Sequence, residues 1–338
     1  MLESKNCSNL ETVKNKSLDH NSKPIVFALI GPTCTYKSSI GIDLASSSSS
    51  EYPFEIISAD SRLVYKGMDI GTSKPSLEER KNIPHYMIDL VEPGIDYSVG
   101  LYKKDAERKI KEIFSKNKIP LFVGGTGLYL NSVLLGLSIP EVKPDVSFRR
   151  QLKSLSQEDL YLRLMRIDPK ACEKIHKNDN FRTVRALEVI YKTNKLFSSL
   201  KSYVKLPFKV IWIGLTYENR DLHFERIKKR TYNFCKDGFV EEVRRLLDTY
   251  GEIDLFKRTI GYSEAIDFLK HKIKLTEMVE KITMHTKQFS KRQKTWFRAN
   301  KEIKWIPLDD LSYKDALERA FSLIEEGSFA NTSMVSIS

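Results

Sequence analysis

The sequence predicts an α/β protein with a parallel β-sheet that is flanked by helices. Continuous apolar runs of strand length occur at residues 25–30, 54–58, 120–123 and 209–215. Stretches of helical character separate these runs, and strands that alternate with helices indicate βαβ units. Runs without polar alternation are typical of strands that are buried on both faces, as in parallel sheets. The functional loops of such a sheet lie at the carboxyl ends of its strands.

The first three expected strands each lead into a polar or glycine-rich turn. The expected order is a strand at 25–30, a turn at 31–33, a helix at 37–45, a strand at 54–58, a turn at 59–61, a helix at 101–117, a strand at 120–123 and a turn at 124–127. Beyond residue 218, after the fourth strand, the pattern is helical again. Ile303–Ile306 is a candidate for a last short strand.

A change of character between residues 138 and 206 predicts a second domain. This stretch is rich in Lys, Arg and Asp and contains no β-type run, so we expect a helical insertion there. The core would then consist of residues 24–137 and 207–328. Residues 1–23 and 329–338 are expected to be disordered tails. A chain of 338 residues fits two domains at about 150 residues each.

Composition narrows the class of protein and of partner. Hydrophobic residues make up 41% and charged residues 30%, which is typical of a globular protein with a sizeable core. No apolar run approaches the ~18 residues of a membrane span. The net charge of +12 favours a polyanionic partner, either nucleic acid or a phosphorylated substrate. The four cysteines form no C-x-x-C pair, which argues against zinc and disulfides and favours the cytoplasm.

Residues 31–38 form a candidate phosphate-binding loop between a strand and a helix. They are Gly31, Pro32, Thr33, Cys34, Thr35, Tyr36, Lys37 and Ser38. In the Walker A pattern G-x-x-x-x-G-K-[ST], backbone N–H groups hold phosphate, the lysine adds charge and the hydroxyl binds Mg²⁺. Tyr36 stands where the pattern has glycine, and a side chain there can crowd the phosphates or disfavour the required backbone conformation. An ordinary strand–helix turn is the alternative.

Asp60 and Thr126 each follow an expected strand, at the edge where parallel sheets bind ligands. Asp60 could accept a proton from a nucleophile, hold Mg²⁺ through water, or simply cap a helix. Thr126 follows two glycines that allow close backbone approach, so its hydroxyl could orient a ligand or cap the next helix. The pattern leaves these alternatives open.

A strongly basic helix is expected within residues 281–304, which contain eight Lys or Arg and one acid. Four of the cations are spaced four, three and four residues apart, which places them on one helical face. They are Lys287, Lys291, Lys294 and Arg298. Three apolar residues recur every seven positions and are expected to pack on the core. They are Ile282, Phe289 and Trp296. Because compensating acids are scarce, contact with a phosphate backbone is favoured over a solvated face.

Two further pairs of arginines lie one helical turn apart. Arg226 and Arg230 are spaced i, i+4, and Arg182 and Arg185 are spaced i, i+3. Each pair could clamp a phosphate or form ordinary surface ion pairs, and the spacing supports both interpretations.

Taken together, these segments resemble the tRNA dimethylallyltransferases, also called tRNA isopentenyltransferases. The matching stretches occur in the family's order and cover residues 24–308: Ile30–Thr33, Ile57–Thr72, Val123–Tyr129, Ile175–Asp179, Arg185–Val189, Thr259–Tyr262 and Thr286–Trp296. The segment Asp-Ser-x-x-x-Tyr-Lys-Gly-Met-Asp is highly specific, whereas many kinases share the phosphate loop. The resemblance implies a P-loop NTPase-like fold with a helical insertion domain.

The resemblance also implies an activity, the transfer of a dimethylallyl group from dimethylallyl diphosphate to N6 of the adenosine next to the anticodon. Asp60 matches the general base, and Thr126 matches a threonine at the reacting centre. Lys37, Ser38 and the loop amides would hold the diphosphate with Mg²⁺, and Arg230 would approach it from the opposite side. The adenosine must leave its stack to reach this pocket.

The family's tRNA-contacting positions are matched in three parts of the chain. They are Asp60, Ser61, Arg62, Leu63 and Thr126 at the target nucleotide, Arg149, Arg182 and Arg185 in the insertion, and Lys291, Arg292 and Gln293 on the basic helix. The expected partners are the anticodon stem-loop of tRNA and dimethylallyl diphosphate. The expected state is a cytoplasmic monomer that does not contact a membrane.

Three rival functions remain open from the sequence. A small-molecule P-loop kinase would explain the phosphate loop and Asp60 but not the basic helix. An adenylate isopentenyltransferase would share the diphosphate chemistry without needing an RNA-binding surface. A tRNA-binding relic without activity is allowed by Tyr36, although we expect a locally rearranged loop that still binds diphosphate.

Overall fold

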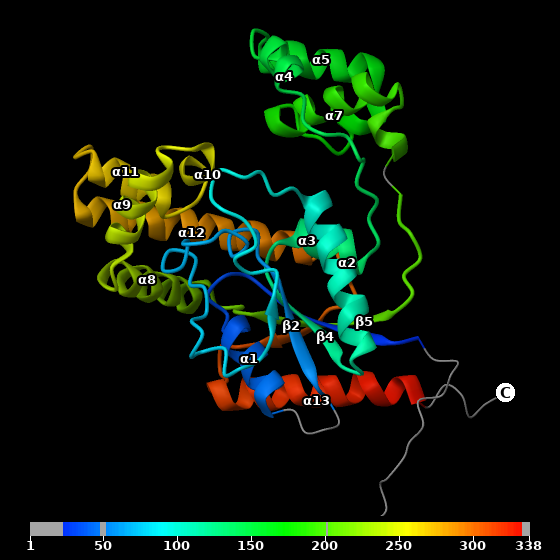
Figure 1. The fold of residues 1–338 in the computed structure, drawn as a ribbon, viewed down its shortest axis with the longest axis vertical. Helices are drawn as coiled ribbons and strands as arrows, with labels where there is room; N and C mark the ends of the chain where they lie inside the picture. The colour runs from blue at the N-terminus through cyan, green and yellow to red at the C-terminus, as the bar shows by residue number, and fades with distance from the viewer. Residues whose placement is uncertain (1–22, 48–51, 201, 333–338) are drawn as a thin grey trace, which may run out of the picture.

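A six-stranded, wholly parallel β-sheet forms the centre of the computed structural model, which describes residues 23–47, 52–200 and 202–332. The spatial order of the strands is β3-β2-β4-β1-β5-β6 (Figure 1). Their bounds are β1 Ile25–Ile30, β2 Phe54–Ala59, β3 His85–Tyr86, β4 Ile119–Gly124, β5 Lys209–Thr216 and β6 Lys304–Pro307. The predicted parallel sheet is therefore confirmed.

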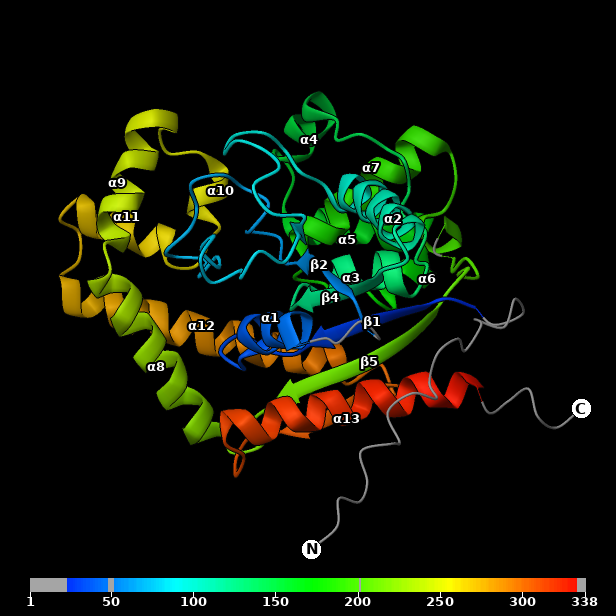
Figure 2. The same cartoon turned by 60° about the horizontal axis from the view of Figure 1, so that its bottom comes forward.

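Helices cover both faces of the sheet, as Figure 2 shows. One face packs on α2 (Val99–Ser115) and α3 (Gly127–Leu134), with Tyr102 and Tyr129 stacked in that core. The other face packs on α1 (Lys37–Ser47) and α13 (Tyr313–Thr332). Because both faces are covered, the long central strands consist mainly of apolar residues, and this is why their sequences show no alternation.

The predicted strands agree with the structure to within one residue at either end, including the last one, β6. The edge strand β3 was not expected, because two residues carry no periodic pattern. The C-terminal tail predicted over residues 329–338 is wrong for residues 329–332, which belong to α13, and its remaining residues lie outside the described part of the chain. The N-terminal tail predicted over residues 1–23 lies, apart from Lys23, outside the described residues.

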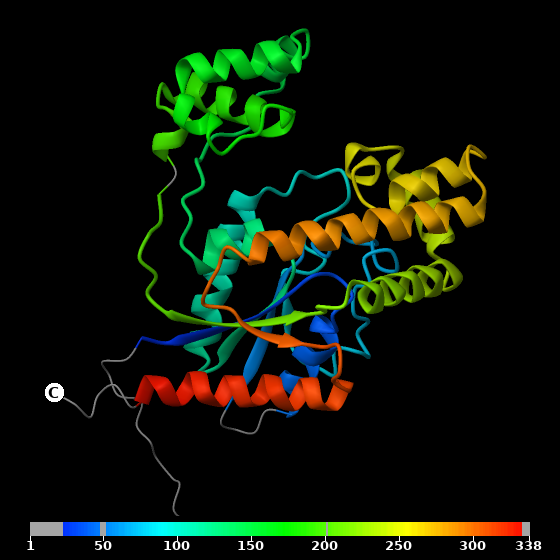
Figure 3. The same cartoon turned by 180° about the vertical axis from the view of Figure 1, so that it is seen from behind.

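Residues 146–200, between α3 and β5, form a helical unit that stands apart from the sheet in Figure 3. Its elements are α4 Val146–Leu152, α5 Gln157–Ile167, α6 Pro169–Cys172, α7 Asn180–Thr193 and the 3₁₀ helix Phe197–Leu200. They enclose a small apolar core that includes Leu160, Leu164 and Ala186. Two extended segments join the unit to the sheet. This is the predicted place of the insertion.

A second helical layer lies beside the carboxyl edge of the sheet (Figures 1 and 3). It consists of α8 Arg220–Lys236, α9 Phe239–Tyr250, α10 Asp254–Lys257, α11 Tyr262–Leu269 and α12 Leu275–Phe297. Its core also takes in Val64, Tyr65 and Met68 from the long β2–β3 connection. This layer therefore packs directly on the segment that follows Asp60. Within the described part of the chain, no helix is long and apolar enough to cross a membrane.

The predicted apolar face of the basic helix α12 is partly wrong. Ile282 is buried, but Phe289 and Trp296 are each 37% exposed. The buried face carries several polar residues instead. It consists of Met278, Ile282, Thr283, Ser290, Gln293 and Phe297. A helix that packs on loop backbone at the edge of a sheet buries hydrogen-bonding groups as well as apolar ones.

Candidate active site

The phosphate loop, Asp60 and Thr126 meet in one crevice at the carboxyl ends of β1, β2 and β4. The crevice has a volume of about 800 Å³. Its predicted lining residues are Thr33, Cys34, Thr35, Tyr36, Lys37, Ser38, Asp60, Ser61, Arg62, Leu63, Thr126, Arg230, Arg292 and Gln293. Because neighbouring parallel strands end at the same edge, residues distant in sequence converge there, as predicted.

The phosphate loop has the curled backbone that an anion-binding nest requires. Cys34 and Tyr36 both adopt left-handed conformations, with φ of 64° and 59°. The Thr35 hydroxyl donates to Pro32 O at 2.8 Å and closes the turn. At Gly31, an added Cβ would lie 2.3 Å from the carbonyl oxygen of Leu215 on β5, so only glycine fits. The loop ends at the N-terminus of α1, where N–H groups favour an anion.

The ring of Tyr36 packs between side chains of α8 and α13. Its ring meets Tyr313 edge-to-face, with 5.4 Å between centroids. The Arg226 guanidinium lies 3.8 Å from its ring centroid on another side. Aromatic and cation–π contacts of this kind offset the strain of a left-handed tyrosine. Tyr36 thus adopts the glycine-like backbone conformation, with its ring held by protein contacts. Arg230 lines the crevice, whereas Arg226 stacks on the Tyr36 ring beside the phosphate loop.

Lys37 folds back over the loop, where its ammonium donates to Pro32 O and lies 3.4 Å from the Thr35 hydroxyl. Burial and the nearby Arg230 lower the pKa of this ammonium to about 8, although Cys34 and Asp60 partly oppose the shift. A bound anion favours the charged form. Ser38 follows in the first turn of α1 and also lines the crevice.

Asp60 and Thr126 hold one loop between them. The Arg62 N–H donates to Asp60 Oδ1 at 2.8 Å, and the Ser61 N–H donates to the Thr126 hydroxyl at 3.1 Å. Asp60 also lines the crevice. A turn, and not a helix, follows Asp60, and the Thr126 hydroxyl reaches this turn instead of capping α3. Asp60 therefore caps no helix, and Thr126 stands at the N-cap position of α3 without a capping hydrogen bond from its hydroxyl.

Arg230 extends from α8 to the phosphate loop and lines the same crevice as Lys37. Its guanidinium donates to the Thr33 hydroxyl, to Ser73 Oγ at 2.9 Å and to Thr72 O at 3.4 Å. These contacts hold the planar cation at the mouth of the loop. Thr72 and Ser73 were not predicted as site residues, although Thr72 ends the family-specific segment 57–72.

Gln293 is buried and bridges two loops of the sheet edge. Its Oε1 accepts from the Thr33 N–H at 2.9 Å, and its Nε2 donates to Gly125 O at 3.0 Å. The sequence had placed it with Lys291 and Arg292, which are exposed.

Lys294 also departs from the predicted exposed face, because its ammonium donates hydrogen bonds to Tyr217 O and to the Glu218 carboxylate. His223, which was not predicted, lies with Nε2 2.9 Å from Thr33 O.

The three arginines predicted in the insertion do not line the crevice, and each of them forms an ion pair within the insertion. Arg149 donates twice to buried Glu188, through Nε and Nη2 at 2.8 Å each. Arg185 pairs with the same carboxylate and also donates to Val142 O. Arg182 is exposed and pairs with Asp179 at 3.4 Å. For the pair Arg182 and Arg185, the structure therefore contains ion pairs, with Asp179 and with buried Glu188.

The crevice offers few protein ligands for a metal. Among the residues that the structure describes, no group of three or more His, Cys, Asp or Glu side chains could hold an ion. Several crevice residues that the sequence did not predict come from α12 and the loop before α11. They are Arg258, Thr259, Ile260, Ile282, Thr286 and Phe289. The segment Thr259–Tyr262 was noted only as a family match.

Comparison with known proteins shows the family to which the chain is similar. A family described as IPP transferase matches residues 63–300. The chain is 44% identical to a tRNA dimethylallyltransferase of Gloeothece citriformis over 304 residues, which are 90% of this chain and 97% of the relative. It is 42% identical to one of Microcystis aeruginosa over 308 residues, or 91% and 95% of the two chains.

Solved structures agree with this assignment. A full-length tRNA isopentenylpyrophosphate transferase from Bacillus halodurans superposes with a TM-score of 0.69 at 30% identity, covering 92% of this chain and 99% of that one. A eukaryotic dimethylallyltransferase that acts on tRNA superposes with a TM-score of 0.77 at 28% identity, covering 91% and 80%. The fold is P-loop NTPase-like, as predicted. The chain belongs to the tRNA dimethylallyltransferases, the IPP transferase family of enzymes.

Proposed function

We propose that this protein transfers a dimethylallyl group from dimethylallyl diphosphate to N6 of the adenosine immediately next to the anticodon in tRNAs. The observation that carries the proposal is the convergence of Asp60 and Thr126 with the phosphate loop and Arg230 in one crevice. A carboxylate beside a diphosphate site suits a displacement in which an amine replaces diphosphate. The proposal includes a cytoplasmic monomer.

In the proposed reaction, N6 attacks the allylic carbon that carries the diphosphate. A nitrogen–carbon bond forms, the carbon–oxygen bond breaks, and diphosphate leaves with both bonding electrons. Asp60 accepts the proton that N6 loses, because an exocyclic amine is a weak nucleophile until that proton departs. Thr126 keeps Asp60 in place through the Ser61 N–H and lines the same space.

Negative charge grows on the diphosphate as it leaves, so donors fixed at that position lower the barrier. Lys37, the amides of the phosphate loop and Arg230 surround this position from two sides. The Ser38 hydroxyl would hold Mg²⁺, and one protein oxygen suffices because this ion takes its remaining ligands from water and phosphate. When bound, Mg²⁺ supplies charge neutralisation on the diphosphate oxygens.

The RNA would lie across the mouth of the crevice. Ser61, Arg62 and Leu63 line it beside Asp60, Arg292 lines it from α12, and Lys291 is exposed on the same helix. In the insertion, Arg182 remains the exposed candidate for a phosphate contact, whereas Arg149 and Arg185 support the local fold around Glu188. Arg182 on α7 and the pair Lys291 and Arg292 on α12 belong to separate helical units, which favours an extended RNA over a free nucleotide such as adenylate as the acceptor.

Incubating the full chain with unmodified tRNA, dimethylallyl diphosphate and Mg²⁺ tests the proposal directly. We expect mass spectrometry of the digested tRNA to detect dimethylallyl-adenosine, and the same nucleoside to vanish from tRNA of a deletion strain. Phosphoryl transfer from ATP to a small molecule would favour the kinase. Tight tRNA binding without formation of dimethylallyl-adenosine would identify a tRNA-binding protein that has no catalytic activity. Prenylation of free adenylate instead of tRNA would identify the adenylate enzyme.

Replacing Tyr36 with glycine should change catalysis little. The loop already has the conformation that glycine would adopt, and the tyrosine ring packs on Tyr313 and Arg226. Relief of left-handed strain offsets the loss of these contacts to within about 1 kcal/mol. We expect KM for dimethylallyl diphosphate and kcat to stay within about threefold of the parent values. A much lower KM in Tyr36→Gly would mean that the ring crowds the diphosphate after all.

Replacing Gln293 with leucine should weaken diphosphate binding and leave tRNA binding intact. Leucine leaves the Thr33 N–H and Gly125 O without their partner, which loosens the phosphate loop. We expect about a tenfold higher KM for dimethylallyl diphosphate, measured at saturating tRNA. The matched variant is Lys291→Ala, two residues away and exposed. It should instead weaken tRNA binding and reduce its salt dependence by about one counterion. Weaker tRNA binding with an unchanged KM for dimethylallyl diphosphate in Gln293→Leu would identify Gln293 as an RNA contact.

A further inference from the structure

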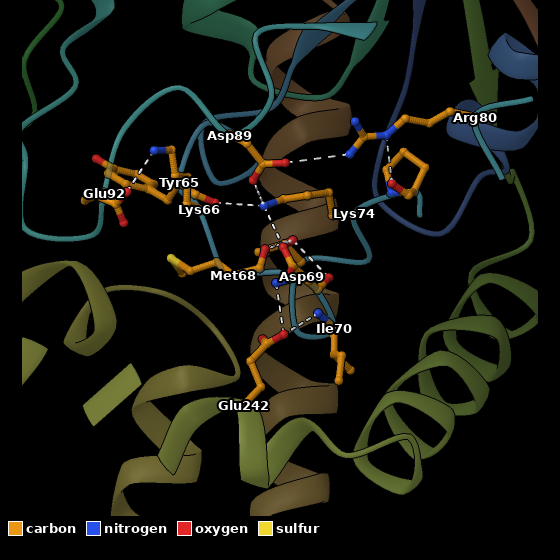
Figure 4. Close-up of polar contacts among 12 residues, drawn as sticks. Tyr65, Lys66, Met68, Asp69, Ile70, Lys74, Arg80, Asp89, Glu92 and Glu242 are labelled. Carbon is orange, nitrogen blue, oxygen red and sulfur yellow. Dashed lines mark hydrogen bonds and ion pairs between the residues drawn. The ribbon is translucent and has the colours of Figure 1, made fainter. Parts of the chain in front are cut away.

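A single buried carboxylate holds the turn that orients Arg230. Glu242, on α9, is 2% exposed and accepts four hydrogen bonds. Its Oε2 accepts from the amides of Asp69 and Ile70 at 3.0 and 2.6 Å, and its Oε1 accepts from the Gly71 amide at 3.2 Å and the Tyr262 hydroxyl at 2.6 Å. Figure 4 shows this side chain rising from α9 to the backbone of the turn. Three consecutive amides aimed at one anion form a nest, which the protein fills with its own carboxylate.

The turn is also fixed from its other side. Lys74, whose side chain is 3% exposed, pairs with Asp69 at 2.7 Å and with Asp89, and it donates to Tyr65 O at 2.8 Å (Figure 4). At Gly71, an added Cβ would lie 2.4 Å from the Phe239 ring, so the backbone presses directly on α9. The position of residues 69–74 is therefore set by buried charges and by close packing.

This turn ends in the two residues that hold Arg230. Ser73 adopts a left-handed conformation, with φ of 53°, and its N–H donates to Ile70 O at 3.0 Å. From that position, Ser73 Oγ and Thr72 O accept from the Arg230 guanidinium. A continuous chain of hydrogen bonds thus runs from Glu242 through the amides of residues 69–71 to Ser73 and on to the cation at the phosphate loop.

We propose that Glu242 is a positioning residue for diphosphate, because it fixes the turn 69–73 and thereby aims Arg230 at the phosphate loop. The inference rests on the proposed function, in which Arg230 binds the diphosphate. Glu242 itself lies behind the turn, in the core of α9 and α11, and does not line the crevice. A plain stabilising residue would affect folding only, whereas a positioning residue changes affinity in the folded enzyme and does so only while Arg230 is present.

A double-mutant cycle on the full chain tests this difference, with inorganic diphosphate as the probe in calorimetry. We expect Arg230→Gln to weaken diphosphate binding by about tenfold to a hundredfold, the range for a charged hydrogen bond. Glu242→Gln, which sets an NH₂ group against donor amides, should weaken it by about tenfold. The double variant should bind no more weakly than Arg230→Gln alone, because the two residues act in series. Glu241→Gln, the exposed neighbour on α9, is the matched control and should bind normally.

The outcomes separate the inference from the function on which it rests. Normal affinity in folded Glu242→Gln, or additive losses in the double variant, would overturn the positioning role while leaving the proposed function intact. Normal affinity in Arg230→Gln would contradict the proposed role of Arg230 itself. If Glu242→Gln does not fold, Tyr262→Phe removes one of the four bonds more gently, and the same non-additivity with Arg230→Gln is then required. Affinity for tRNA should be unchanged in every variant.

Discussion

Replacing Asp60 with asparagine should lower kcat for tRNA prenylation by about 10²–10⁴-fold, the contribution typical of a positioned general base. Asparagine has nearly the same shape and keeps the oxygen that accepts the Arg62 N–H. The turn that carries Ser61 and Arg62 therefore stays in place, and only the ability to take a proton is lost. Single-turnover measurements with saturating tRNA and dimethylallyl diphosphate isolate this step from binding and product release.

Binding measurements complete the test of Asp60. Affinity for tRNA and for diphosphate should be nearly unchanged in Asp60→Asn, since the residue is proposed to act on a proton that moves only during the reaction. The matched variant is Asp248→Asn, an exposed carboxylate on α9, which should react at the parent rate. A kcat in Asp60→Asn within a few-fold of the parent would remove the general base from the mechanism. A large loss of tRNA affinity with kcat intact would make Asp60 a binding residue only.

The sheet and the crevice could be predicted from the sequence because both depend on local signals. Buried parallel strands appear as continuous apolar runs, and the polar residues that follow them must lie at one edge of the sheet. Asp60, Thr126 and the phosphate loop were located by this reasoning alone. The conformation of Tyr36 could not be predicted in the same way, because its ring is held by Tyr313 and Arg226, which are far away in the sequence.

Charge and periodicity predicted less reliably which residues are exposed, wherever a side chain contacts a buried partner from another part of the chain. The seven-residue spacing of Ile282, Phe289 and Trp296 suggested an apolar face, but α12 packs on loop backbone and buries Gln293 instead. A glutamine in this position looks exposed until the two loops that it joins are known. Likewise, no sequence signal distinguishes Glu242 from its exposed neighbour Glu241, since both lie in the first turn of α9 and only the fold decides which meets the nest.

Replacing Glu188 with alanine should destabilise the insertion by about 3–5 kcal/mol, because it leaves two cations without their buried partner. Glu188 is completely buried on α7 and accepts from Arg149, Arg185 and the Asp145 N–H. Burial alone would raise the pKa of Glu188, but these hydrogen bonds outweigh it and lower the pKa, so the group is a carboxylate at neutral pH. In thermal unfolding, the insertion of this variant should melt at a lower temperature than that of the parent, as a separate transition, because the insertion has its own small core.

Replacing Glu188 with alanine should weaken the binding of tRNA but not of diphosphate. The insertion carries exposed Arg182 and joins the sheet through two extended segments, whereas the diphosphate crevice belongs to β1, β2, β4 and the layer of α8 and α12. Loss of the insertion fold should therefore weaken tRNA binding and leave the affinity for inorganic diphosphate unchanged. The matched variant is Glu158→Ala, an exposed acid at the start of α5, which should leave both affinities intact. Equal losses for tRNA and diphosphate would mean that the two regions fold as one unit and that the insertion also supports the crevice.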